Sequence, residues 1–167
     1  MSILRTLGAW ALLAVPAVGM PQAQAPGGHP HSMNDHARHM AAAPADTRQA
    51  VKFPDALRAH TLTNMRDHLL ALAEIQDALA RSQFDQASDI AEQRLGMSSL
   101  ALHGAHEVAK FMPKGMQDAG TAMHRSASQF ATLAKDASVT GDLKPALAGL
   151  ARLSQTCVAC HAGYRLQ

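Results

Sequence analysis

The chain of 167 residues has only two cysteines and one tryptophan, and aromatic residues make up 4% of it. A structural zinc site built from two cysteine pairs is therefore absent from the sequence, as is the βαβ pattern that accompanies a redox dithiol. The chain also lacks a large excess of charge of either sign, because its 15 basic and 13 acidic residues give a net charge of +2. This balance gives no electrostatic reason to bind nucleic acid or an anionic membrane surface.

The two cysteines lie close together near the end of the chain, in Cys157-Val158-Ala159-Cys160-His161. Thiols at this spacing can form thioethers to the two vinyl groups of haem, and the adjacent histidine is then held beneath the iron as an axial ligand. A disulfide would close only a small loop and would leave His161 unexplained. The spacing predicts one covalently attached haem c. A porphyrin would also help to fill a core that is poor in aromatic residues.

Residues 1–25 have the features of a secretory signal peptide. Arg5 gives a positive start, residues 7–18 are apolar, and Ala23-Gln24-Ala25 is a small-residue cleavage site. An uncleaved membrane anchor is the alternative, although the apolar stretch is short for a spanning helix. We expect export to the periplasm, with no stable membrane span after cleavage.

Residues 26–50 are rich in Pro, Gly, Ala and His and show no hydrophobic periodicity, which predicts a disordered leader. A solvated linker is the simplest interpretation, and transient capture of copper or zinc is the alternative. The potential metal ligands in this leader are His29, His31, Met33, His36, His39 and Met40.

The remaining segment, residues 51–167, reads as four helices separated by turn residues. We expect them at about 55–80, from 85 to just before Pro113, at about 114–137, and from about 142 to the end, with Pro145 in the first turn. No segment alternates with the period of a half-buried strand. Short connections between long helices favour antiparallel neighbours, so the predicted fold is all-α, an up-down-up-down four-helix bundle enclosing the haem.

Two helices show a strict four-three repeat, which predicts their buried faces. In the third helix the repeat contains Met116, Gly120, Met123, Ala127, Phe130, Ala134 and Ala137. In the fourth it contains Leu143, Leu147, Leu150, Ser154, Cys157, His161 and Tyr164. The haem residues thus occupy inward positions, and we expect the porphyrin to insert between helices.

With these features the chain resembles the cytochrome c prime family, exported four-helix bundles whose last helix carries the haem sequence and ends in Cys-x-x-Cys-His-x-x-Tyr-Arg or similar. The resemblance covers about residues 55–165. It implies that Cys157 and Cys160 hold the haem, that His161 is the proximal ligand, and that Tyr164 and Arg165 belong to the recurrent tail. Arg165 would pair with a haem propionate or be a solvated terminal cation.

The resemblance also implies that a first-helix residue decides the sixth iron position. Periodicity alone leaves two seams of the first helix open. One contains Leu62, Met65, Leu69, Leu72, Gln76 and Leu79, and the other contains His68, Leu72, Ile75 and Leu79. We favour Met65 as distal ligand, with His68 second, because the Met65 seam is more apolar and a thioether binds haem iron opposite histidine. Plain core packing is the alternative for Met65 and the favoured interpretation of Met116 and Met123. His103 and His106, three residues apart in the second helix, are interpreted as solvated, with a surface metal site as the alternative. His60 and His124 are interpreted in the same way.

The predicted function is a periplasmic electron carrier with one haem c and His/Met ligation, which exchanges single electrons with periplasmic redox partner proteins. No catalytic residues are assigned, because no nucleophile–base pair or carboxylate pair stands at a suitable place. The alternative is a five-coordinate haem protein that binds NO or CO, with Leu69 or Leu72 covering the iron. Association into a homodimer is left open.

Overall fold

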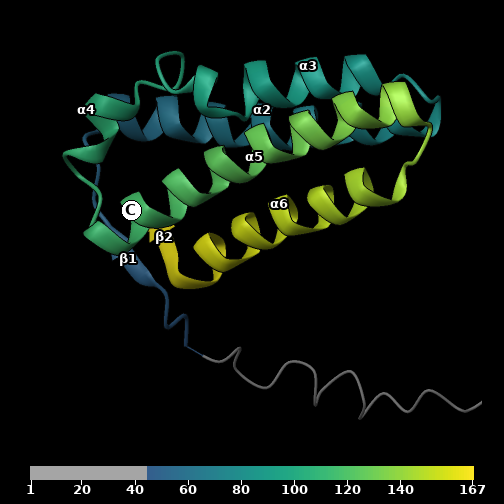
Figure 1. Ribbon diagram of the computed structural model, residues 1–167. Helices are drawn as coiled ribbons and strands as arrows, with labels where there is room; N and C mark the ends of the chain where they lie inside the picture. Colours follow the sequence, from purple (N-terminus) through teal and green to yellow (C-terminus); the bar gives the residue numbers. More distant parts are fainter. Residues whose placement is uncertain (1–44) are drawn as a thin grey trace, which may run out of the picture. The chain divides into compact units, whose positions relative to one another are not determined.

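The computed structural model describes residues 45–167, which form a predominantly helical domain (Figure 1). The all-α fold class is therefore confirmed. The elements in chain order are β1 (Gln49–Val51), α2 (Asp55–Ala80), α3 (Phe84–Arg94), the short 3-10 helix η1 (Met97–Ser99), α4 (Ala105–Ala109), α5 (Lys114–Thr140), α6 (Lys144–Gly163) and β2 (Tyr164–Leu166).

Proline and glycine set the bounds of the long helices. Pro54 and Pro113 immediately precede α2 and α5, where a proline's fixed φ suits the entry into a helix and its missing N–H costs nothing. α5 ends at Gly141, whose φ of 73° is left-handed and favours glycine. α6 begins two residues later than expected, with Pro145 in its first turn. The predicted first helix matches α2 at both ends.

The predicted second helix, 85 to 112, is wrong as a single element. It breaks after Arg94 into η1 and the five-residue α4. Two features accompany the break. Gly104 has a left-handed φ of 59°, which a helix interior does not allow. Near η1, the Glu92 carboxylate accepts a hydrogen bond from the Ser98 backbone N–H at 3.1 Å. The break matters because it carries the chain, including His103, across the end of the domain.

Each long helix packs against the next one along the chain: α2 on α3, α3 on α5, and α5 on α6. The main core between them is built mostly from alanines with a few large residues, of which Phe130, Ile75, Leu95 and Leu153 are fully buried. Small side chains let the helices approach closely. The seam predicted for α5 is confirmed from Met123 to Ala137.

The predicted inner faces of α2 and α6 are only partly correct. On α2 the buried residues are Thr61, His68, Ala71, Ile75, Ala78 and Leu79, whereas Leu69 is 68% exposed. The better apolar seam, through Met65 and Leu69, is thus not the buried face. On α6 Leu147 is half-exposed and the core is reached by Ala146, Gly149, Leu150 and Leu153. The predicted faces followed the leucine positions, but alanine and glycine occupy the closest contacts between helices.

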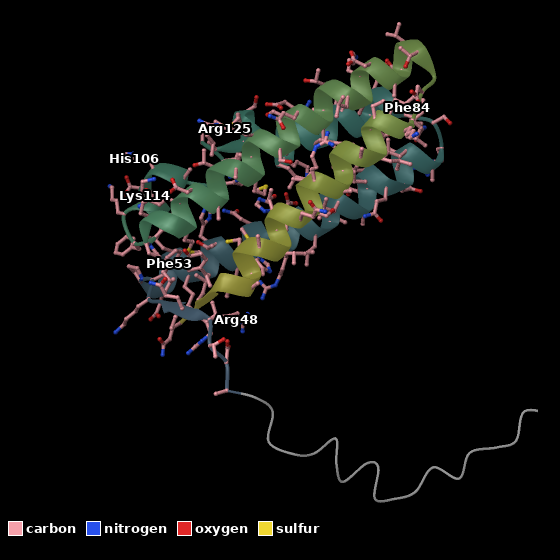
Figure 2. All side chains as sticks on the ribbon, turned by 60° about the horizontal axis from the view of Figure 1, so that its bottom comes forward. Arg48, Phe53, Phe84, His106, Lys114 and Arg125 are labelled. Atoms are coloured by element: carbon pink, nitrogen blue, oxygen red, sulfur yellow. The ribbon has the colours of Figure 1, made fainter. Side chains whose placement is uncertain are left out.

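Both ends of the described chain meet in a two-stranded parallel sheet that the sequence did not indicate. Gln49 pairs with Tyr164 and Val51 with Leu166, and the Gln167 N–H donates to the Val51 carbonyl at 3.0 Å. Val51, Phe53 and Val108 form a second, smaller core there. Figure 2 places Phe53 at this end of the domain and Phe84 at the other.

The sheet includes Gln49 and Ala50, which the sequence analysis assigned to the leader. The proposed signal peptide and the His- and Met-containing part of the leader lie outside the described residues. None of the helices within residues 45–167 combines the length and apolar character that crossing a bilayer requires.

Val51 tests the contribution of the strand pair to stability. Its side chain is 5% exposed in the smaller core, so Val51→Ala should lower the free energy of unfolding by about 2 kcal/mol through lost burial and a residual cavity. The matched control is Val139→Ala at an 85% exposed position, with an expected change within about 0.5 kcal/mol. Urea unfolding measures both, and equal effects would contradict the packing described here.

Candidate functional site

A cavity of about 590 Å³ lies at the end of the domain closed by the strand pair. It is bordered by the first half of α2, the segment from Leu100 to Met112, the first half of α5 and the last turns of α6. Beyond it on one side is the main core and on the other the smaller core. The helices thus pack tightly at one end of the domain and leave space between them at the other.

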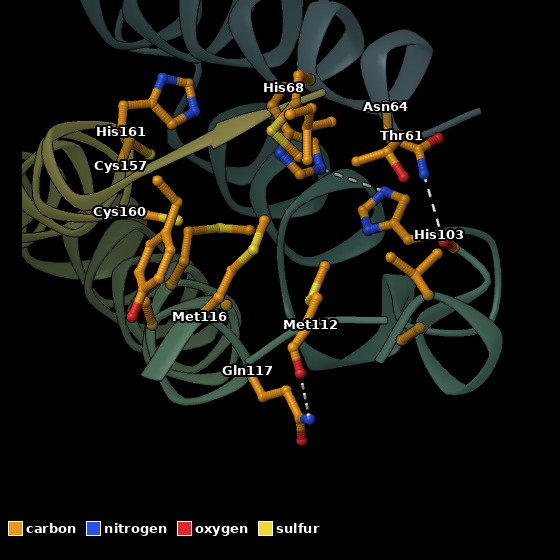
Figure 3. A pocket seen from close by; sticks show the side chains of 18 of the residues that line it. Thr61, Asn64, His68, His103, Met112, Met116, Gln117, Cys157, Cys160 and His161 are labelled. Carbon is orange, nitrogen blue, oxygen red and sulfur yellow. Dashed lines mark hydrogen bonds between the residues drawn. The ribbon is translucent and has the colours of Figure 1, made fainter. Parts of the chain in front are cut away.

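The three residues of the predicted attachment sequence all line this cavity. Figure 3 shows Cys157, Cys160 and His161 on one side, with His68 and His103 on the other. Both cysteines are free thiols, and burial raises the pKa of each. A redox-active dithiol needs the opposite shift, which a helix N-terminus favours, whereas these thiols lie in the last turns of α6. The geometry favours protonated, non-redox thiols.

The α2 wall brings both predicted distal candidates, Met65 and His68, to the same cavity. The two residues lie on it together because positions three apart share one side of a helix. His68 is the more buried of the two. Three further methionines line the cavity: Met112, Met116 and Met123. Packing had been assigned to Met116 and Met123, and both do contact hydrophobic clusters while also facing the cavity. Met112 had not been considered.

The interpretation of His103 and His124 as solvated residues is wrong. His124 is 8% exposed, as is His68, and His103 is half-buried. The ring centroids of His68 and His103 are 4.7 Å apart, those of His103 and His124 5.4 Å, and those of His68 and His124 6.3 Å. His106 is exposed as expected. The sequence signal for this cluster is that His124 directly follows Met123, a member of the buried repeat of α5.

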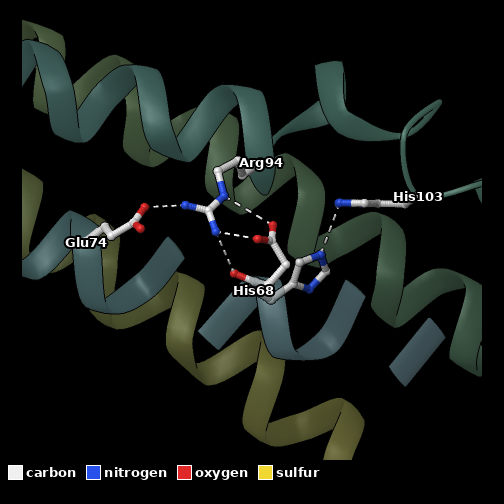
Figure 4. A network of polar contacts seen from close by, with 5 residues as sticks. His68, Glu74, Arg94 and His103 are labelled. Carbon is white, nitrogen blue, oxygen red and sulfur yellow. Dashed lines mark hydrogen bonds and ion pairs between the residues drawn. The ribbon is translucent and has the colours of Figure 1, made fainter. Parts of the chain in front are cut away.

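Burial and neighbouring charge keep the His68 ring neutral. Desolvation, followed by the proximity of His103 and His124, lowers the pKa of His68 from 6.5 to about 4. The adjacent Asp67 does not reverse this effect, because its carboxylate accepts hydrogen bonds from Arg94, which also pairs with Glu74 (Figure 4). At neutral pH one nitrogen of the His68 ring therefore carries a lone pair.

Three arginines line the cavity: Arg48, Arg58 and Arg165. Asp46 forms a bidentate pair with Arg48, which holds the pKa of that carboxyl well below its usual range. The Arg165 Nε lies 3.4 Å from the Asp46 carboxylate. This contact is an ion pair and not a hydrogen bond, so the Nε has no hydrogen-bond acceptor in the described part of the protein.

Tyr164 is positioned by a close approach to α5. A Cβ added at Gly115 would overlap the Tyr164 hydroxyl, so the glycine makes room for the ring. The Tyr164 ring and Leu166 contact the smaller core. Tyr164, three positions after His161, thus links the end of α6 to the strand end of the domain.

The Gly115–Tyr164 contact can be measured by a double-mutant cycle. Gly115→Ala should cost about 1 kcal/mol, because the ring must move. In a Tyr164→Phe background the same substitution should be neutral or stabilising, since alanine favours a helix over glycine by about 0.5–1 kcal/mol. Urea unfolding of the four proteins checks this. Strictly additive effects would show that the two residues do not touch.

The comparisons with known proteins add no assignment. No family model matches the chain, and neither a curated protein nor a solved structure resembles it at a significant level.

Proposed function

We propose that this protein is an exported c-type cytochrome that holds one covalent haem c in the cavity and exchanges single electrons with periplasmic proteins. One observation carries the proposal. The cavity has the complete attachment sequence of α6 on one wall and a thioether and imidazoles on the opposite wall, from α2 and its neighbours. The α2, α3, α5 and α6 helices would then form an up-down-up-down bundle around the haem.

The volume and the lining of the cavity are compatible with a haem. Cofactor pockets typically measure about 300–1,000 Å³ and are mainly apolar with a few polar groups. Gly120 lines the cavity, and a Cβ added there would meet nothing within 4 Å, so this part of the wall is open. The Arg165 Nε is ion-paired with Asp46 but makes no hydrogen bond in the described residues, and it would supply a donor for a propionate carboxylate. Arg48 and Arg58 add positive charge around the same cavity.

Each residue has a defined role in the proposal. The Cys157 and Cys160 thiols would add across the two vinyl groups, and both bonds form without an oxidant because each S–H is added to a C=C. His161 would bind the iron from the α6 side, and Met65 from the α2 side. When bound, haem supplies a one-electron couple, whose potential an axial methionine raises.

The gas-binding alternative loses the residues on which it was based. It required Leu69 or Leu72 to cover the iron, but Leu69 is largely exposed and neither residue lines the cavity. The side chains that do face the attachment sequence include good iron ligands. The two functions remain distinguishable by the coordination of the iron.

The covalent attachment is tested on the purified mature protein. We expect its mass to exceed that of the chain by one haem. The haem should also remain with the protein after acid-acetone extraction, because acid and acetone do not cleave thioether bonds. Cys157→Ala combined with Cys160→Ala should release the haem into the solvent. Ser154→Ala, one turn earlier in α6 and not on the cavity, is the matched control and should retain it. Extraction of the haem from the wild type would rule out the attachment.

The distal ligand is tested by Met65→Leu, which preserves most of the side-chain volume. The oxidised wild type should be low-spin, with a methionine-to-iron charge-transfer band and weak carbon monoxide binding. The variant should become high-spin and bind the gas, since a leucine offers no donor atom. Optical and electron paramagnetic resonance spectra measure the change.

The matched comparison is His68→Gln on the same wall of the cavity. If this variant changes the spectrum and Met65→Leu does not, the ligand is His68. A wild type that is already high-spin and binds carbon monoxide readily would favour gas binding over electron transfer.

A further inference from the structure

We propose that residues 46–51 form a latch that closes the cavity on a bound cofactor, and that a carboxylate of this cofactor, bound by Arg165, keeps the latch closed. The latch rests on the proposed haem function and adds to it a route by which the haem enters. It consists of β1 and the three residues that precede β1. Its partner strand, β2, directly follows α6 and so lies next to the attachment sequence.

The strand pair holds α2 and α6 beside each other. α2 packs on α3, α3 on α5 and α5 on α6, but within residues 45–167 α2 and α6 are not packed along their length. Leu69 on α2 and Leu147 on α6, which were both predicted to face inward, are 68% and 49% exposed. The ladder joins the segment before α2 to the segment after α6 (Figure 1). Opening the ladder would therefore let these two helices separate beside the cavity.

The latch and its partner strand are part of the cavity wall. Arg48 in the latch and Arg165 and Leu166 in β2 all line the cavity. The latch is held by three residue pairs of the ladder and by the contact of Val51 and Leu166 with the smaller core. Short elements with few buried contacts are the ones that open locally while the rest of a domain stays folded. The latch is thus the part of the described wall that can open at the lowest cost.

Two arginines and one carboxylate give this end of the cavity one excess positive charge. Arg48 donates to both carboxylate oxygens of Asp46, at 2.9 and 2.8 Å. The Arg165 Nε lies 3.4 Å from the same carboxylate, and this buried atom has no hydrogen-bond acceptor in residues 45–167. One further carboxylate in the cavity would supply both the missing negative charge and the missing acceptor.

This second carboxylate would connect the latch to β2. Arg165 pairs with Ala50 in the ladder, and Arg48 lies two residues before Ala50. An anion bound by both arginines therefore adds a link between the two strands that exists only when the cavity is filled. Because such a ligand binds the closed state better than the open one, it shifts the latch toward closure. The empty protein opens more often, which allows haem to enter between α2 and α6.

Hydrogen exchange of the loaded protein, followed by mass spectrometry, tests the latch. The amides of residues 49–51 should exchange about 10-fold or more faster in Arg165→Gln than in the wild type, because a hydrogen bond to a charged group is lost. Asp46→Asn is the matched comparison, since it removes the protein's own carboxylate and leaves Arg165 for the cofactor. Its exchange should stay within about threefold of the wild type, as expected for an exposed ion pair. Arg152→Gln, exposed on α6 and not on the cavity, controls for the loss of a positive charge and should exchange as the wild type does. Equal acceleration in Arg165→Gln and Asp46→Asn would overturn the proposal.

The haem-free protein separates the latch from the haem assignment. Cys157→Ala combined with Cys160→Ala, after extraction of the haem, should exchange fast at residues 49–51, and adding Arg165→Gln should change this little. Residues 130–137 of α5, in the main core, report whether the domain stays folded. If they also exchange fast, the comparison of the loaded variants decides. Slow exchange of residues 49–51 without haem would overturn the latch alone, whereas a mature protein without covalent haem would overturn the proposed function and the latch with it.

Discussion

Residues 49–51 and 164–166 form a parallel backbone ladder that joins the two ends of the described domain. β1 leads through three residues into α2, and β2 follows α6 directly, so the ladder fixes the first turns of α2 beside the last turn of α6. Without it both termini would be the most mobile parts of the chain. The candidate iron ligands lie on those same two helices, and their positions across the cavity depend on this pairing.

The helices pack tightly at one end of the domain and surround a cavity at the other. Alanines dominate where α2, α3, α5 and α6 meet, and their small size brings the helices close together. Toward the strand pair the lining changes to methionines, histidines and arginines, which are flexible or polar side chains rather than core formers. Such a lining is what the proposed cofactor would require, namely apolar surface with a few polar groups.

The iron ligands proposed for the haem come from opposite walls of one cavity. His161 lies on α6, whereas Met65 and His68 lie on α2. The proposed coordination of the iron therefore depends on how the first half of α2 and the last turns of α6 are held relative to each other.

The sequence by itself determined the helical fold class, the bounds of α2 and the position of the Cys-x-x-Cys-His motif on the last helix, because these depend on local signals: proline before a helix and a 3.6-residue period. It did not determine which leucines face inward, since alanine contacts and not leucine content set the buried faces of α2 and α6. Only the tertiary structure decided the break at Gly104, the β1–β2 pairing and the meeting of His68, His103 and His124. The strand pair and the His68–His103 contact join residues 35 or more positions apart in sequence, and no local pattern encodes a distance between separate segments.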